Sequence, residues 1–355
     1  WNPLPSFSVT TFADAVRVLR DGQTFASRIN AEAMAPFMGE FMVGMDGDEH
    51  RRYRNLVAHA FRRSALDRWR ADLIEPAIDR LLDPIAANGR ADLVAELTSR
   101  YPVQVICGIV GVPLEDHEQF NAWAEAINYG PLNPDAGLAA AQAMVDYLEP
   151  LVEARRHEPT GDLLSELVHA EIDGERLTDG KLYGFLRLLL PAGAETTYRL
   201  FGSCLVALLT HPEALERVRG DRTLLPAVIE ETLRWETSVT MVSRVATADT
   251  EVGGCPVPAG SPVTVFNSSA GRDASRWDDA DEWDLDREPL PHLGFGGGVH
   301  QCLGMHLARL ELEIGVGAVL DRLPGLRLDP EHPQPAVSGY AFRGPPELRV
   351  VFDRE

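Results

Sequence analysis

The chain has 355 residues, a formal net charge of −21, and 45% hydrophobic and 25% charged residues. This composition is typical of a globular protein and not of a disordered one. The negative charge argues against a nucleic-acid partner, because phosphate binding needs a positive surface. The four cysteines stand far apart with no CxxC pair, which argues against a disulfide framework and suits the reducing cytoplasm.

A membrane-spanning segment is not expected. The longest apolar stretch, residues 186–209, contains Arg187, Glu195 and Arg199, three charges that a membrane span rarely tolerates. No signal-peptide pattern follows Trp1. We therefore expect a soluble, cytoplasmic protein.

Helical periodicity dominates the chain. A very long helix is predicted from about Thr178 to Thr210, roughly 48 Å at about 1.5 Å per residue. The remaining predicted helices cover residues 51–82, 91–110, two parts of 120–156 around a breaker-rich stretch at 130–134, and 226–235.

Strand signals are confined to short pieces of the chain. The best of them lie in residues 239–245, 251–265 and 348–352, while residues 271–291 show no period and are predicted to form a loop. The predicted fold class is therefore mainly α with a minor β portion.

The strongest local signal is the segment 295–304, FGGGVHQCLG. Its consecutive glycines allow positive φ angles and a close approach to something flat and bulky. Cys302 follows at the start of a predicted apolar helix, whose dipole and free N–H groups would stabilise a thiolate. A nucleotide loop does not fit, because Val299 or Gln301 would have to be glycine, and a zinc site lacks a second ligand pair. A glycine-rich turn with a buried cysteine is the plainer alternative.

This segment resembles the haem-binding loop of the cytochrome P-450 family, Phe-x-x-Gly-x-Arg/His-x-Cys-x-Gly, and every fixed position is filled. The resemblance implies heme b (iron protoporphyrin IX) as cofactor. It implies Cys302 as the axial ligand of the iron and His300 as a hydrogen-bond donor to a haem propionate. Phe295 and Gly304 fill the outer fixed positions of this cofactor-binding loop.

The resemblance extends in the right order over residues 12–352. It implies a cytochrome P-450-like fold, with the long central helix over the haem, and one haem-thiolate catalytic domain over residues 1–355. Family members usually have several dozen more residues before the position of Trp1, so a missing N-terminal segment is expected. The segment 270–274, AGRDA, replaces the usual Ala-Asn-Arg-Asp-Pro, a departure that we regard as neutral.

The middle of the long predicted helix carries PAGAETT, residues 191–197. Proline and glycine oppose helix stability, and we expect a widened turn there that exposes carbonyls and lets a threonine relay protons from an acid. The alternative is an exposed acid beside threonines that bond back to carbonyls. The segment resembles the family motif Ala/Gly-Gly-x-Asp/Glu-Thr-Thr/Ser, which implies Thr196 as the alcohol and Glu195 as the acid that control proton delivery.

Three further residues resemble a structural network of the family. Glu231 and Arg234 stand at i and i+3 on one predicted helix, a spacing that by itself is most often a surface pair. Their order before the cysteine loop resembles the family's Glu-x-x-Arg pair, and Arg287 resembles the arginine that completes it. The resemblance assigns these three residues to folding and haem retention.

Three more residues resemble propionate-binding positions of the family. His50 and Arg54 share a helix face at i and i+4, where an arginine can clamp a carboxylate and a histidine can add a hydrogen bond. A solvated basic stripe is the alternative. Arg244, on a predicted strand, matches a third propionate-binding residue.

Three activities are compatible with this resemblance. The first is a monooxygenase that uses dioxygen and takes electrons from a separate ferredoxin, as soluble bacterial members do. The second is a peroxide-dependent peroxygenase or dehydratase, but such members typically lack the acid–alcohol pair. The third is a non-catalytic haem sensor or electron carrier, which needs no polar interruption in the long helix. We predict the monooxygenase.

The predicted substrate is a small apolar organic molecule. Methionines and aromatic residues in 31–45 suit an apolar ligand, although core packing explains them equally well. The resemblance places the pocket wall at Leu189, Ala194, Val239, Met241 and Phe342.

The electron donor is expected to dock on a basic surface. Residues 51–70 hold seven arginines and one acid, Asp67, and in the family this helix lies on the cysteine side of the haem. A solvated helix face is the alternative. We expect a monomer whose ferredoxin-type donor docks near Arg51, Arg52, Arg62 and Arg63.

Overall fold

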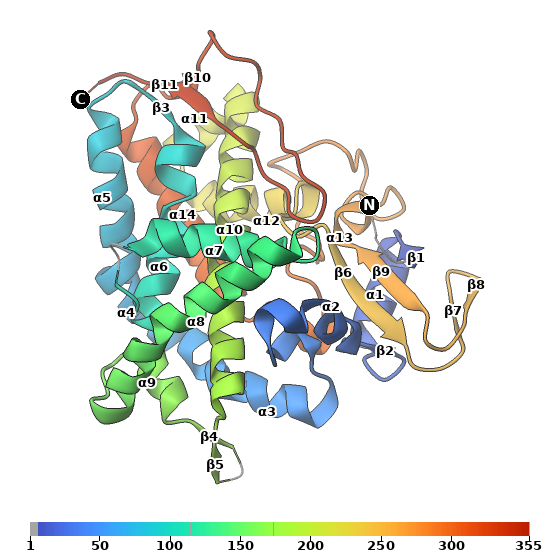
Figure 1. Ribbon diagram of the computed structural model, residues 1–355. Coiled ribbons are helices and arrows are strands. Elements are labelled where there is room, and N and C mark those ends of the chain that lie inside the picture. The colour runs from blue at the N-terminus through green and yellow to red at the C-terminus, as the bar shows by residue number, and fades with distance from the viewer. Residues whose placement is uncertain (1–5, 114–115, 173, 355) are drawn as a thin grey trace.

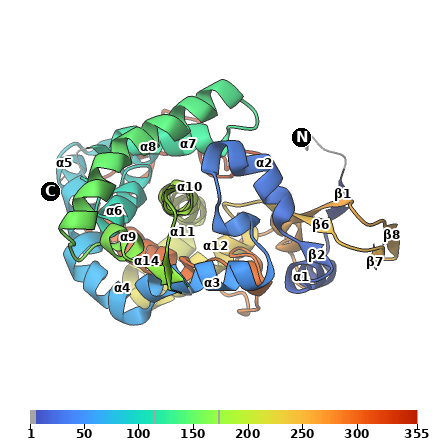
Figure 2. The same ribbon diagram turned by 60° about the horizontal axis from the view of Figure 1, so that its bottom comes forward.

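A single helix of 32 residues, α10 (Asp179–Thr210), runs through the middle of the molecule in the computed structural model, which describes residues 6–113, 116–172 and 174–354. Figure 1 shows its full length, and Figure 2 looks along it and shows other helices on every side. The Thr178 side chain caps its first turn by accepting from Lys181 N. Apolar residues around its whole circumference suit such a buried position.

The helices that surround or flank α10 form the larger part of the fold (Figures 1 and 2). At Gly193 an added Cβ would lie 2.8 Å from Ile106 Cγ1, so this glycine permits close contact between α10 and α6. These helices are α5 (Glu75–Ala86), α6 (Tyr101–Val110), α7 (His117–Asn128), α8 (Pro134–His157), α9 (Leu163–Val168), α11 (Pro212–Gly220), α12 (Leu225–Trp235) and α14 (Met305–Arg322).

The smaller part lies to one side of this helical body and contains a four-stranded sheet (Figure 1). Its strand order is β1-β9-β6-β2, with β1 parallel to β9 and the other pairs antiparallel. The strands are β1 (Phe7–Val9), β2 (Phe25–Ala26), β6 (Met241–Ala246) and β9 (Pro262–Phe266), and the neighbouring helices are α1 (Phe12–Arg20), α2 (Arg28–Met38) and α13 (Asn267–Ala270).

Shorter elements complete the fold. A three-stranded sheet has the order β10-β11-β3. In addition, β4 pairs with β5, and β7 pairs with β8. Their bounds are β3 (Arg90–Asp92), β4 (Glu171–Ile172), β5 (Glu175–Arg176), β7 (Thr250–Val252), β8 (Cys255–Val257), β10 (Arg327–Leu328) and β11 (Arg349–Val351). The basic region predicted over residues 51–82 is divided into α3 (Gly47–Ala58), α4 (Arg63–Trp69), a π-helix (Arg70–Ile74) and α5.

The predicted fold class is confirmed, and two local predictions are wrong. Residues 91–110 are not one helix, because β3 pairs with β11 and Asp92 Oδ1 accepts from Leu348 N at 3.0 Å. A π-helix (Val94–Thr98) and α6 follow it. The widened turn in α10 is absent, since the helix continues through Pro191. Within the described residues, no helix is both long and apolar enough to cross a membrane.

Candidate active site

The glycine-rich loop before α14 is held in shape by its own backbone. Gly296 N donates to Leu293 O at 2.8 Å, and Cys302 N donates to Phe295 O at 2.9 Å. Gly296 and Gly298 have φ angles of 67° and 68°, which side chains other than glycine rarely adopt. The loop therefore needs glycine at these two positions to present Cys302.

Cys302 is an accessible thiol whose surroundings differ from the sequence prediction. It is exposed, and α14 begins three positions later at Met305. The displacement of water by nearby protein atoms raises the pKa of Cys302, while the Gly304 N–H, Arg54 and Arg309 act to lower it. The N–H group that precedes α14 thus favours the thiolate as the sequence predicts, but burial outweighs it in the protein alone. A coordinated metal cation deprotonates a thiol outright, so this pKa is compatible with a metal ligand.

Two histidines and two arginines from separate elements meet beside this loop. The rings of His50 on α3 and His300 have centroids 4.0 Å apart. Their Nε2 atoms are buried, and neither has a hydrogen-bond partner among the described residues. Arg54 Nη2 donates to Gln301 O at 2.6 Å, and the buried Arg244 on β6 donates to the Ser243 carbonyl at 2.8 Å.

This cluster is electrostatically prepared for an anion. Burial, followed in order of effect by the charges of His50, Arg244 and Arg54, lowers the pKa of His300 to about 3. Burial also lowers the pKa of Arg244, opposed by the charge of Asp46. Buried cations and unpartnered imidazole nitrogens are costly unless a ligand pairs with them. The donor set fits the two propionates of a haem placed against Cys302.

One face of α10 remains accessible although other helices surround it (Figure 2). Ala192 is exposed, and Leu188 and Thr196 are half-buried. These residues stand at i, i+4 and i+8, so they line one stripe of the helix. Leu189 and Ala194, two residues of the predicted pocket wall, are buried on other faces. On the accessible stripe of α10 the apolar side chains are therefore those of Leu188 and Ala192, and not those of Leu189 and Ala194.

The predicted acid and alcohol make separate hydrogen bonds. Thr196 Oγ1 donates to Ala192 O at 2.8 Å, the back-bonding that was the alternative interpretation of this motif. Glu195 is 2% exposed; it accepts from Asn128 Nδ2 on α7, and from Arg199 Nη2 at 2.8 Å. Burial raises the pKa of Glu195 although both donors act to lower it. The spacing of Arg199 from Glu195 was a usable sequence signal, whereas nothing in the sequence indicated Asn128.

Val239, Met241 and Phe342 of the predicted wall lie in two places. Val239 and Phe342 are paired in an isolated antiparallel bridge. Met241 lines a groove of about 460 Å³ together with Trp235 and Arg272. It stands three positions from Arg244 on β6, so the two side chains leave opposite faces of the strand. Met241 is thus separated from the propionate cluster by its own strand.

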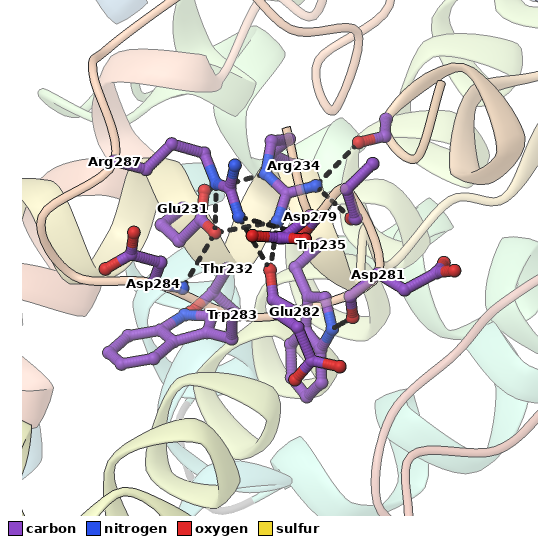
Figure 3. Close-up of polar contacts among 12 residues, drawn as sticks. Glu231, Thr232, Arg234, Trp235, Asp279, Asp281, Glu282, Trp283, Asp284 and Arg287 are labelled. Atoms are coloured by element: carbon purple, nitrogen blue, oxygen red, sulfur yellow. Dashed lines mark hydrogen bonds and ion pairs between the residues drawn. The ribbon is translucent and has the colours of Figure 1, made fainter. Parts of the chain in front are cut away.

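Glu231 and Arg234, both buried on α12, form one network with the half-buried Arg287 of the following irregular segment (Figure 3). Arg234 donates to both carboxylate oxygens of Glu231, each at 2.7 Å. Its other three N–H groups go to the carbonyls of Gly271, Ala280 and Glu282. Arg287 Nε donates to Glu231 Oε1 at 3.0 Å. This network holds the irregular segment 271–291 against α12.

Phe295 is supported by a second ion-pair cluster that sequence reasoning missed. The Arg309 guanidinium lies 4.6 Å from the centroid of the Phe295 ring. Glu230 accepts from Arg309 Nε at 2.6 Å and contacts His292 Nε2 at 3.1 Å. Burial acts to raise the pKa of Glu230, but the hydrogen bonds from Arg309 and His292 outweigh it and lower that pKa to about 2.

No group of three or more His, Cys, Asp or Glu side chains suited to holding a metal occurs in the part of the chain that the structure describes. A single thiolate beside a cluster that fits two carboxylates is instead the donor set expected for haem iron.

Comparison with known proteins identifies the class. The family described as Cytochrome P-450 matches residues 2–336. The mycinamicin IV hydroxylase/epoxidase of Micromonospora griseorubida is 36% identical over 97% of this chain and 89% of its own. The nocardicin C N-oxygenase of Nocardia uniformis is 39% identical over the same shares. The solved structure of the cytochrome P-450 CYP109Q5 from Chondromyces apiculatus has a TM-score of 0.90 at 32% identity, covering 100% of this chain and 91% of that one.

The chain belongs to the cytochrome P-450 family. It is a monooxygenase, and its cofactor is haem.

Proposed function

We propose that this monooxygenase inserts one atom of dioxygen into a small apolar organic molecule and takes its electrons from a separate ferredoxin. The observation that carries the proposal is the accessible stripe of α10, where Leu188 and Ala192 stand beside the Thr196 hydroxyl. Such a surface offers apolar contacts with one polar group for orientation. The relatives are named for hydroxylation, epoxidation and N-oxygenation of different molecules, so relatedness does not select a substrate.

The haem is assigned to the thiol and the propionate cluster. Cys302 is the iron ligand, and His50, Arg54, Arg244 and His300 pair with the propionates, which removes the cost of burying unpaired cations. When bound, the haem supplies the redox chemistry that activates dioxygen. Phe295 and Gly304 shape the loop on either side of the thiol.

Proton supply is assigned to Glu195 and Thr196. The overall reaction consumes one substrate C–H bond, dioxygen, two electrons and two protons, and gives an alcohol and water. Thr196 Oγ can both accept and donate a proton, and Glu195 is the adjacent acid. A hydroxyl on the accessible stripe can direct protons, whereas the buried carboxyl can only supply them through a neighbour.

The electron donor is assigned to the face formed by α3 and the start of α4. Arg54 ties α3 to the cysteine loop through Gln301 O, so this face adjoins Cys302. Arg51 and Arg62 are exposed, and Arg51 pairs with Asp48 at 2.9 Å. Arg52 lies on α3 and Arg63 at the start of α4, but the side chain of Arg63 is outside the described part. Exposed cations would steer an acidic ferredoxin toward an otherwise negative protein.

The proposal is tested in two stages. A library of apolar compounds is first screened for ligands that shift the haem absorption band of the ferric protein. Positive compounds are then incubated with ferredoxin, its reductase, NADPH and ¹⁸O-labelled dioxygen. A product with one ¹⁸O atom supports the proposal, and faster turnover on hydrogen peroxide than on dioxygen would overturn it.

The role of Thr196 is tested with the same compounds. Thr196→Ala is expected to bind haem and ligand normally but to divert most of the NADPH into hydrogen peroxide, because the proton relay is lost. Oxygen consumption, peroxide and product are measured together, with Thr210→Ala, another back-bonded threonine of α10, as the control. Unchanged coupling in Thr196→Ala would reject this role.

A further inference from the structure

Arg187 on α10 is a half-buried cation that forms no ion pair with any described residue. Its Nη1 donates to Phe37 O at 3.2 Å and its Nε donates to Tyr183 O at 3.4 Å, so both acceptors are carbonyls. Its Nη2 makes no hydrogen bond within the described part of the chain. The protein has 54 acidic against 33 basic residues, and arginines that leave the solvent are usually paired. The lack of a carboxylate partner here therefore needs an explanation.

Burial makes Arg187 similar to the two arginines of the propionate cluster. Within the described part of the chain, burial lowers the pKa of Arg54, Arg187 and Arg244. Cys302 opposes this effect at Arg54, and Asp46 opposes it at Arg244. At Arg187 burial is the single cause, because no acid acts on it. A cation in such surroundings is stabilised when an anion pairs with it.

The guanidinium of Arg187 lies at one end of the accessible stripe of α10. Gly184 stands four positions before Leu188, so it extends the same stripe toward the start of the helix. An added Cβ at Gly184 would collide with Glu40 O, and one at Gly39 would lie 2.6 Å from Arg187 Nη2. The segment after α2 therefore covers the stripe at this end, and Arg187 Nη2 lies against that segment.

The stripe has a cation near one end and a hydroxyl near the other. Arg187 and Thr196 are nine positions apart on α10, which corresponds to about 14 Å at about 1.5 Å per residue. Between them the stripe presents the apolar side chains of Leu188 and Ala192. A molecule that lies along α10 would thus meet a positive charge at one end, apolar groups over its length and the Thr196 hydroxyl at the other end.

We propose that Arg187 is a specificity-determining residue that binds a carboxylate of the substrate through Nη2, while its bond to Phe37 O holds the guanidinium in place. The substrate is then an apolar molecule with one carboxylate, and it is oxidised near Thr196, about 14 Å from its charged end. The fork of N–H groups on a guanidinium matches a carboxylate. This inference rests on the proposed function, because it places the substrate on the accessible stripe.

The first test is a binding screen of the ferric holoenzyme with paired compounds. Each apolar scaffold is present as a carboxylate and as its primary amide, with straight chains from octanoate to hexadecanoate and fused-ring acids of similar length. Binding is measured by the shift of the haem absorption band, without any electron donor. We expect the carboxylates to bind about ten- to a hundred-fold more tightly than their amides, the range for one hydrogen bond to a charged group. Equal affinities within the pairs, or a screen that yields no carboxylate ligand, would overturn the proposal.

The second test repeats the paired measurement in variants of Arg187. Arg187→Gln keeps an N–H donor for Phe37 O but removes the charge, so the preference for the carboxylate is expected to fall to about two-fold or less. Arg187→Lys keeps the charge and is expected to retain part of the preference. Arg155→Gln is the control, because it removes one charge from α8, where Arg155 pairs with Asp162 at 2.8 Å. An unchanged preference in Arg187→Gln would show that Arg187 only ties α10 to α2, and the proposal would be rejected.

The two proposals fail on different results. If the preference for a carboxylate depends on Arg187 but the bound acids take up no ¹⁸O from labelled dioxygen, the proposed function fails while the binding role of Arg187 stands. If instead an uncharged compound takes up ¹⁸O and Arg187→Gln leaves its affinity and that of every carboxylate unchanged, only the role of Arg187 fails.

Discussion

Two buried arginines, Arg234 and Arg244, differ in how many of their N–H groups have hydrogen-bond partners. Arg234 is 3% exposed and donates all five of its N–H groups, two to the Glu231 carboxylate and three to carbonyls (Figure 3). Arg244 is 5% exposed, yet its only hydrogen bond within the described residues goes to Ser243 O. No carboxylate there forms an ion pair with it.

The difference separates a structural group from a binding group. A buried cation whose donors all have partners needs no further ligand, and it holds together the segments to which it is hydrogen-bonded. A buried cation without a counter-ion stores an energetic cost that an anionic ligand relieves. His50 and His300 lie in the second region: their Nε2 atoms make no hydrogen bond within the described residues, and the Asp46 carboxylate is 3.9 Å from His300 Nε2. The α12 network therefore supports the fold, and the cluster around Arg244 is suited to binding an anion.

The largest expected effect follows from breaking the α12 network. Arg234→Ala leaves the buried Glu231 carboxylate with Arg287 Nε and Asp284 N as its remaining donors, and removes three bonds to the 271–291 segment. We expect a loss of about 3–5 kcal/mol in the free energy of unfolding, measured by urea denaturation. Arg287→Ala, which is expected to lose less, provides a readable variant if Arg234→Ala does not fold. Equal midpoints for Arg234→Ala and the wild type would refute the structural role.

Arg244→Met provides the complementary test. We expect the haem-free protein to be at least as stable as the wild type, because an uncompensated charge leaves the interior. The holoprotein should lose haem about ten- to a hundred-fold faster, since one charge-assisted contact of about 1.5–3 kcal/mol is absent. Haem transfer to apomyoglobin measures this rate. The control is Arg187→Met, whose guanidinium donates to Phe37 O and should not affect haem. If Arg244→Met instead made the haem-free protein less stable and left the rate of haem loss unchanged, Arg244 would be a structural group and not a binding group.

The smallest of these effects concerns Arg62 and Arg63, which belong to neither region. Electron transfer from ferredoxin should slow as ionic strength rises, because exposed charges are screened beyond about 8 Å at physiological salt. Reversing Arg62 and Arg63 to Glu should slow it several-fold without changing ligand binding. Reversing Arg80 and Arg354, two exposed arginines elsewhere, makes the same change in net charge and should have less effect. Stopped-flow reduction that is indifferent to salt and to the first reversal would remove this docking face.

The sequence predicted those features that depend on local pattern. The span of α10 from the Thr178 cap to Thr210 follows from periodicity and its flanking residues, and the loop around Cys302 follows from its glycines. Contacts between distant segments were predictable only where a family motif marks both partners, as for Glu231 and Arg287. The pairing of β3 with β11 replaced an expected helix, and Asn128 reaches Glu195 across 67 positions. Leu189 and Ala194 are buried, because helix rotation, set by the packing of the whole bundle, decides which face of α10 remains open.

The central claim is that Cys302 binds the haem iron, and the carbon monoxide spectrum of the reduced protein tests it most directly. The wild type is expected to show the strongly red-shifted band of a thiolate-ligated haem. In Cys302→Ser that band should disappear, while Cys255→Ser, at the other exposed cysteine, should retain it. A Cys302→Ser protein that keeps the red-shifted band would contradict the account.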